Sequence, residues 1–197
     1  MHNLDQGVTR FQNELFPARA ELFAHLANNH APHTLFIGCS DARVVPELIT
    51  GTDPGDLFVI RNAGNLVPAY APMSGGVTAS IEYAVTVLGV RDIVVCGHSA
   101  CGAMTALAES HDLSQAPAVA AWLRHADASL ARTADPSDVD ALVRANVSAQ
   151  IASLATHPSV ARALIAGQVT IHGWVFDIAT GAISEITSDA EVPAAAH

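Results

Sequence analysis

The chain has 197 residues, of which 50% are hydrophobic and 14% are charged. This length and composition exclude an intrinsically disordered protein and favour one large domain with a sizeable core. The formal net charge is −10 and the basic residues are all arginines without a cluster, which excludes nucleic acid and anionic membrane surfaces as partners.

The first predicted element is a helical arm over residues 1–30. Apolar residues recur there at helical spacing, and Pro17 separates an N-terminal segment from a second helix. Because Phe11, Leu15 and Phe16 make the arm apolar, we expect it to pack on a second copy of the chain, in a homodimer or a higher homo-oligomer.

Three short apolar segments follow, and each is typical of a buried parallel strand. They cover residues 34–38, 57–60 and 93–96, and Gly, Pro, Asp or Asn residues bound them. Helical stretches at residues 45–50 and 77–88 lie between them. This alternation, with strands too apolar to have one wet face, predicts an α/β fold.

The second half of the chain is mainly helical and ends in two strands. Helical periodicity covers residues 118–130 and 139–154, and Asp138 is the expected N-cap of the second stretch. Residues 169–176 and 182–186 predict a final pair of strands joined by a turn.

Together these elements predict a single domain over residues 1–197. Its expected architecture is a mostly parallel central sheet with helices on both faces, an N-terminal helical arm and a C-terminal antiparallel edge strand. The Ala-rich tail at residues 190–197 is expected to be disordered. No uninterrupted apolar stretch reaches the roughly 18 residues that a spanning helix needs.

The cysteines indicate the cellular compartment. Cys39, Cys96 and Cys101 are an odd number of thiols in a chain too large to need disulfides. Residues 1–10 also lack the basic segment and apolar stretch of a secretory signal. We therefore expect a cytoplasmic protein with reduced thiols, in which Cys96 is a buried strand residue and the other two serve metal binding or catalysis.

Reactive side chains follow two of the predicted strands. Cys39 and Asp41 come directly after the first strand, and His98 and Cys101 come after the strand at 93–96. In open α/β sheets ligands bind beyond the C-terminal ends of the strands, so these two loops can converge. Two thiolates and an imidazole are donors that zinc favours, and a catalytic zinc keeps its fourth position open. Asp41 is the nearby candidate for a fourth ligand, and Arg43 competes for its carboxylate.

Two other interpretations of these residues stay open. The thiols and the histidine are also compatible with ordinary core packing. The segment from Gly97 to Cys101 nearly matches the G-x-S-x-G nucleophile elbow of α/β hydrolases, with Asp140 and His172 as nominal triad partners. The last glycine of that motif is missing, and the elbow leaves Cys39 and Asp41 unexplained.

The motifs resemble those of β-class carbonic anhydrases. The segments 39–43 (CSDAR) and 98–102 (HSACG) are similar to the signature pair of that family, and the blocks 61–65 (RNAGN) and 75–84 (GGVTASIEYA) are similar to the two blocks between them. Further segments, among them 156–160 (THPSV) and 172–175 (HGWV), most resemble the bacterial branch that accompanies cyanate breakdown. The resemblance extends to about residue 186.

The resemblance implies a zinc enzyme that hydrates carbon dioxide reversibly to bicarbonate and a proton. It assigns Zn²⁺ to Cys39, His98 and Cys101, and a catalytic dyad to Asp41 and Arg43. It also implies a small-molecule site for carbon dioxide and bicarbonate, formed in part across a subunit interface. The residues assigned to that site are His30, Phe58, Ala63, Tyr83 and Gly102. His30 stands where close relatives have a glutamine.

Two further functions share the same ligand set. A zinc-stabilised binding module or inactive relative keeps the metal without hydrating carbon dioxide, although intact Asp41 and Arg43 argue against it. A lyase or hydrolase that acts on carbon disulfide or carbonyl sulfide uses the same ligands. Substrate assays separate these alternatives.

Overall fold

A computed structural model describes residues 4–71 and 75–186 of the chain. The chain divides into two compact units, one ending at Ala31 and the other beginning at Pro32. The tail at residues 190–197 lies outside the described residues. The organisation as a single domain stays a prediction.

The first unit is mainly helical up to Leu26. It consists of α1 (Leu4–Arg10), the π-helical turn η1 (Phe11–Leu15), the 3-10 turn η2 (Pro17–Arg19) and α2 (Ala20–Leu26). Proline has no N–H to donate and its ring strains the preceding turn, so the α-helix is interrupted around Pro17 as expected. The rings of Phe16 and Phe23 pack together with centroids 5.2 Å apart, yet no described residue of these four elements is buried.

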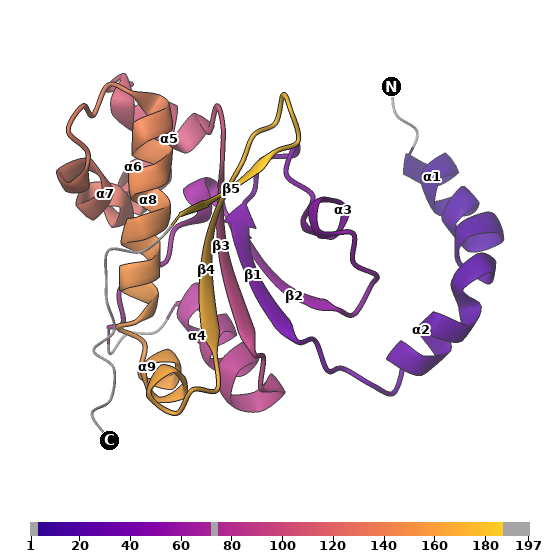
Figure 1. Ribbon diagram of the computed structural model, residues 1–197. Helices are drawn as coiled ribbons and strands as arrows, with labels where there is room; N and C mark the ends of the chain where they lie inside the picture. Colours follow the sequence, from indigo (N-terminus) through magenta and orange to yellow (C-terminus); the bar gives the residue numbers. More distant parts are fainter. Residues whose placement is uncertain (1–3, 72–74, 187–197) are drawn as a thin grey trace. The chain divides into compact units, whose positions relative to one another are not determined.

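The second unit is built on a five-stranded sheet (Figure 1). Its strands are β1 (Thr34–Cys39), β2 (Leu57–Asn62), β3 (Asp92–His98), β4 (Thr170–Phe176) and β5 (Ile183–Ile186). They lie in the order β2-β1-β3-β4-β5, with the first four parallel and β5 antiparallel to β4. The predicted fold class, with its antiparallel C-terminal edge strand, is confirmed.

Helices connect the strands and cover the sheet. In chain order they are α3 (Pro46–Thr50), η3 (Ala63–Asn65), α4 (Gly76–Glu82), η4 (Tyr83–Leu88), α5 (Gly102–Ala108), α6 (Pro117–Leu123), η5 (Arg124–Ala126), α7 (Asp127–Arg132), α8 (Val139–Leu154) and α9 (Pro158–Ile165). The helical stretch expected over residues 118–130 is confirmed as helical, but the 3-10 turn η5 divides it into α6 and α7. At the junction the buried Ala126 has φ −100° and ψ 4°, which turns the chain where its small side chain enters the core.

The two faces of the sheet are covered unequally. Leu35, Ile37, Ile93 and Val95 lie on one face without solvent exposure, in a large core with the helices that follow β2. A smaller cluster of Phe36, Val94 and Cys96 lies apart from that core. Thr50, at the end of α3, lines one cavity with Phe36 and Val94, so the end of this short helix lies beside the second face. Within the described parts of the chain, no helix is both long and apolar enough to cross a membrane.

Helix α8 lies unusually close to the sheet. Asp138 caps it as predicted, because its carboxylate accepts hydrogen bonds from the N–H groups of Asp140 (2.9 Å) and Ala141 (3.0 Å). A Cβ atom on Gly97 of β3 would lie 2.9 Å from the side chain of Val147. This approach lets polar side chains of α8 reach the segment that follows β2.

Candidate metal centre

Three potential metal ligands meet at the C-terminal edge of the sheet. Cys39 is the last residue of β1, His98 is the last residue of β3, and Cys101 is the N-cap of α5. Their ligand atoms all lie within 4.8 Å of one another, and the three side chains are buried. The parallel neighbours β1 and β3 thus bring together residues 59 and 62 positions apart in sequence, as the strand-end argument predicted.

His98 presents one ring nitrogen to this cluster. Its Nδ1–H donates to the carbonyl oxygen of Ser99 at 2.9 Å, which leaves a lone pair on Nε2. Among the described residues, buried Nε2 has no hydrogen-bond partner. Because burying an unpartnered nitrogen costs free energy, the arrangement fits a metal ion that takes this lone pair.

The two thiols behave as a pair when no metal is bound. A hydrogen bond from Cys101 is the main cause that lowers the pKa of Cys39, against the opposing effect of burial. The same bond is the main cause that raises the pKa of Cys101, with burial adding to it. Two thiols that share one proton in this way give up that proton when both bind a cation.

Asp41 is held at the edge of the cluster by Arg43. The guanidinium donates from Nε to Oδ1 at 2.9 Å and from a terminal nitrogen to Oδ2 at 2.7 Å, and the backbone N–H of Arg43 adds a third bond to Oδ1 at 2.9 Å. The bonds from Arg43 hold the pKa of Asp41 well below its usual range. Oδ2 lies 3.9 Å from Nε2 of His98, so the carboxylate is next to the ligands without hydrogen bonding to that nitrogen.

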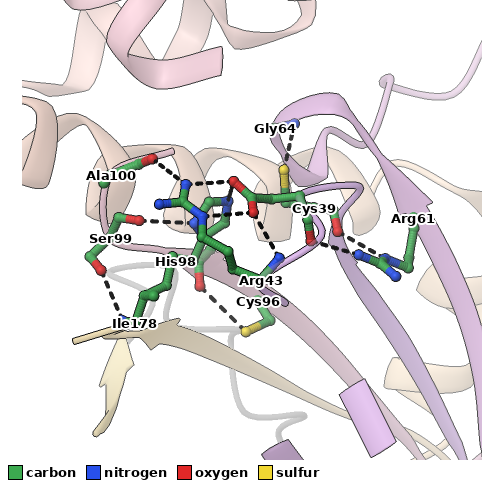
Figure 2. A network of polar contacts seen from close by, with 11 residues as sticks. Cys39, Arg43, Arg61, Gly64, Cys96, His98, Ser99, Ala100 and Ile178 are labelled. Atoms are coloured by element: carbon green, nitrogen blue, oxygen red, sulfur yellow. Dashed lines mark hydrogen bonds and ion pairs between the residues drawn. The ribbon is translucent and has the colours of Figure 1, made fainter. Parts of the chain in front are cut away.

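Hydrogen bonds from residues 61–64 fix the loop after β1 that carries Cys39 and Asp41 (Figure 2). Arg61 donates to the carbonyl oxygens of Cys39 at 3.0 Å and of Asp41 at 2.7 Å. Gly64 donates its N–H to the sulfur of Cys39 at 3.4 Å. In the sequence, residues 61–65 were noted only for their similarity to a family motif, and no role was predicted for Arg61 or Gly64.

The loop after β3 is tied to the end of the sheet. Ser99 donates its N–H to the carbonyl oxygen of Phe176 at 2.9 Å, and its hydroxyl accepts the N–H of Ile178 at 2.9 Å. Ala100 follows with φ +51°, and its carbonyl oxygen accepts a bond from Arg43 at 3.1 Å. The turn after β4 therefore fixes the carbonyl group that orients His98.

The five residues predicted to contact substrate are distributed over both units of the chain. Ala63 directly precedes Gly64, and Gly102 is the first residue of α5. The rings of Phe58 and Tyr83 contact each other with centroids 5.9 Å apart, and Tyr83 is 43% exposed. The exposed His30 belongs to the first unit. A substrate role for each of the five stays a prediction.

The alternative of a nucleophile elbow gains no support from the structure. His172, its nominal base, pairs with Asp92 Oδ1 at 2.9 Å. Asp92 is the first residue of β3, whereas Ser99 comes after the last residue of that strand. A strand of this length separates its two ends by about 20 Å, so His172 pairs at the opposite end of β3 from Ser99.

Comparisons with known proteins agree with the geometry. A family model described as carbonic anhydrase matches residues 34–183. The carbonic anhydrase of Pseudomonas aeruginosa is 57% identical over 192 residues, which cover 94% of this chain and 87% of that protein.

Solved structures are similar over nearly the whole chain. The β-carbonic anhydrase CcaA has a TM-score of 0.86 and 38% identity, and the match covers 92% of each chain. A structure from a study of two tetrameric β-carbonic anhydrases of Sordaria macrospora has a TM-score of 0.71 and 36% identity, covering 93% of this chain and 92% of that one. The chain therefore belongs to the carbonic anhydrase family, and within it to the β class.

Proposed function

We propose that the enzyme holds Zn²⁺ with Cys39, His98 and Cys101 and hydrates carbon dioxide reversibly to bicarbonate and a proton. The observation that carries this proposal is the buried cluster of two thiols and one imidazole nitrogen within 4.8 Å of one another. Soft sulfur donors together with imidazole favour zinc over magnesium or calcium. The activity is that of the family to which the chain belongs.

Three protein ligands suit a catalytic metal site, because the fourth position stays open to water or substrate. When bound, zinc supplies a Lewis acid that makes a water molecule nucleophilic near neutral pH. Within this chain Asp41 is the carboxylate beside the ligands, and its bonds to Arg43 hold it away from the open position. The protein thus keeps the fourth position free by an ion pair.

Asp41 acts as a hydrogen-bond acceptor in this proposal. The bonds from Arg43 keep its pKa low, so the carboxylate is ionised throughout the working pH range and only accepts. An acceptor fixed next to the ligands would accept a hydrogen bond from the reacting water along one direction only. This orients the remaining lone pairs of the water oxygen toward the carbon atom of carbon dioxide.

Apolar groups suit the substrate, because carbon dioxide has no net dipole. We assign Phe58, Ala63 and Tyr83 to the wall of its site, in agreement with the family pattern. The N–H of Gly102 stands at the start of α5, where a helix leaves its first N–H groups without an intrahelical acceptor. We assign it to an oxygen of bicarbonate.

Metal analysis combined with a stopped-flow assay of carbon dioxide hydration tests the proposal. We expect one zinc per chain and rapid hydration that a chelator abolishes and zinc restores. A zinc protein without hydration would instead be a binding module. If carbon disulfide or carbonyl sulfide were turned over faster than carbon dioxide, the substrate assignment would be overturned.

We also propose a homo-oligomer in which the N-terminal unit packs on a second copy. Leu4, Val8 and Leu15 are 80%, 55% and 48% exposed, and α1 to α2 contain no buried residue. Such an apolar segment is stabilised when a partner covers it. The tetrameric relatives from Sordaria macrospora support this assembly.

Deleting the residues before Pro17 should shift the protein to a monomer and lower the hydration rate at least about tenfold, because an assembly interface is lost. Light scattering and the hydration assay measure both effects. Glu14→Ala is the matched control in the same arm, since an exposed ion pair such as that of Arg10 with Glu14 contributes little. An active, well-folded monomer would refute the proposal.

We further propose that His30 serves substrate contact and proton transfer, because an imidazole both donates and accepts protons near neutral pH. His30→Gln should keep the KM and make turnover depend on added buffer at neutral pH. His33→Gln is the control, since His33 bonds Thr34 at the start of β1, whereas Cys39 ends that strand. Equal buffer dependence in the parent and in His30→Gln would contradict the role in proton transfer. Unchanged kinetics in His30→Ala would show that His30 is not part of the site.

The physiological setting follows from the same residues. We propose a cytoplasmic enzyme, since both thiol ligands have to stay reduced. We also propose that it belongs to the branch accompanying cyanate breakdown, on the resemblance of segments such as 156–160 and 172–175. A host strain without this gene should then grow poorly on cyanate, and carbon dioxide enrichment should relieve the defect. Equal growth with and without the gene would contradict the branch assignment.

A further inference from the structure

One peptide group near the metal centre is hydrogen-bonded at both ends. The N–H of Gly64 donates to the sulfur of Cys39 at 3.4 Å. The carbonyl oxygen of Ala63, in the same peptide group, accepts the indole N–H of Trp122 at 2.9 Å. Because a trans peptide is planar, its C=O and N–H point in opposite directions, so whatever fixes the carbonyl also aims the N–H.

The neighbouring peptide groups are held by other side chains. Asn146 of α8 donates to the carbonyl oxygen of Gly64 at 3.0 Å, and Gln150 accepts the N–H of Val67 at 2.8 Å. Both amides are buried, at 1% and 0% exposure. They fix the segment as a whole, whereas the indole of Trp122 bonds the peptide whose N–H donates to the sulfur of Cys39. The backbone N–H of Asp41, on the loop of Cys39 itself, is a second donor to that sulfur.

The backbone at this position leaves little room for adjustment. Gly64 has φ +78°, and a Cβ atom on it would lie 3.0 Å from the Cβ of Ala103. The peptide can rotate only if its hydrogen bonds change. A donor to a peptide carbonyl also polarises the peptide group and strengthens the N–H of that group as a donor, by about 10–30% per bond.

We propose that Trp122, on α6 and 83 residues from Cys39 in sequence, is a positioning residue of the metal centre: its indole N–H aims and polarises the Ala63–Gly64 peptide toward the Cys39 thiolate. The indole touches neither metal nor substrate in this role. It acts by controlling how much negative charge the sulfur donates to the metal. This inference rests on the proposed metal site.

Cobalt substitution of the full-length protein tests the inference. Tetrahedral cobalt with two thiolate ligands gives a sulfur-to-metal charge-transfer band in the near ultraviolet. In Trp122→Phe we expect that band to move to longer wavelength, because a thiolate with a weaker hydrogen bond holds its electrons less tightly. We also expect metal affinity, measured by competition with a chelator, to fall about tenfold, at the low end of the effect of residues that support ligands.

Two further variants separate the hydrogen bond from packing. Site-specific replacement of Trp122 by β-(3-benzothienyl)alanine keeps the shape of the ring and removes only the N–H, so it should shift the band as Trp122→Phe does. Trp174→Phe changes the other tryptophan, on β4, and should leave the band unchanged.

The possible outcomes are distinguishable. If the parent protein binds no cobalt or shows no thiolate band, the proposed metal site is wrong. If the parent shows the band and both changes at Trp122 leave it in place, the positioning role is overturned. A shift in Trp122→Phe alone, or an equal shift in Trp174→Phe, would also overturn it, because packing rather than the N–H would be the cause.

Discussion

Cys101→Ser should lose its metal and, with it, the hydration activity. Cys101 is fully buried among the ligands and is the N-cap of α5. Serine is a good N-cap residue, so the helix should form while the thiolate donor is missing. We expect metal affinity to fall by more than about 100-fold, beyond the cost of losing a residue that only supports a ligand. Metal content after gel filtration and stopped-flow hydration measure the two losses.

Cys96→Ser is the matched control for this change. The thiol of Cys96 lies within β3, where burial raises its pKa to about 12 and its S–H contacts the carbonyl oxygen of Gly97 at 3.4 Å. It stays a neutral thiol, and a serine hydroxyl can make the same contact. This variant should keep one metal and the parent rate. A Cys101→Ser protein with full metal and full rate would refute the ligand assignment.

Arg43→Ala should lose activity at neutral pH and regain part of it as the pH rises. Without the guanidinium, Asp41 keeps only the backbone N–H at residue 43, and Oδ2 lies 3.9 Å from His98 Nε2. The carboxylate is then free to take the open metal position. Removing Arg43 raises the pKa of Asp41 toward its ordinary acidic value, so Asp41 remains ionised at neutral pH. The substitution therefore changes where this negative charge lies and leaves the charge itself in place.

The recovery has a chemical cause, because hydroxide becomes a stronger competitor for the open position as its concentration increases. We expect a loss of about 10- to 100-fold in kcat/KM at neutral pH, in the range seen when a residue that supports a metal site is removed. A pH profile of kcat/KM measures this, and cobalt absorption bands should report the added carboxylate. Arg162→Ala, at an exposed arginine of α9, is the control. A pH profile equal to that of the parent would contradict the gate.

Local patterns in the sequence were sufficient for the sheet and for the meeting of Cys39, His98 and Cys101 in one cluster. Short apolar strands and the reactive residues at their C-terminal ends can be recognised from a few consecutive residues. Burial on both faces and the strand-end location of ligands are general properties of α/β sheets. The same holds for Asp138, since an N-cap bonds only the next few residues. The helical pattern over 118–130 did not reveal the break between α6 and α7, because the periodicity continues through the 3-10 turn η5.

The supports of the site depended on tertiary structure. Trp122 meets Ala63 across 59 residues, and Asn146 meets Gly64 across 82. Such contacts arise only when α6 and α8 pack beside the segment after β2, and no periodicity or motif encodes that placement. The sequence by itself therefore determined which side chains can bind the metal. The tertiary structure decided which peptide groups and supporting side chains hold those residues in place, because hydrogen bonds between distant segments depend on how the helices pack on the sheet.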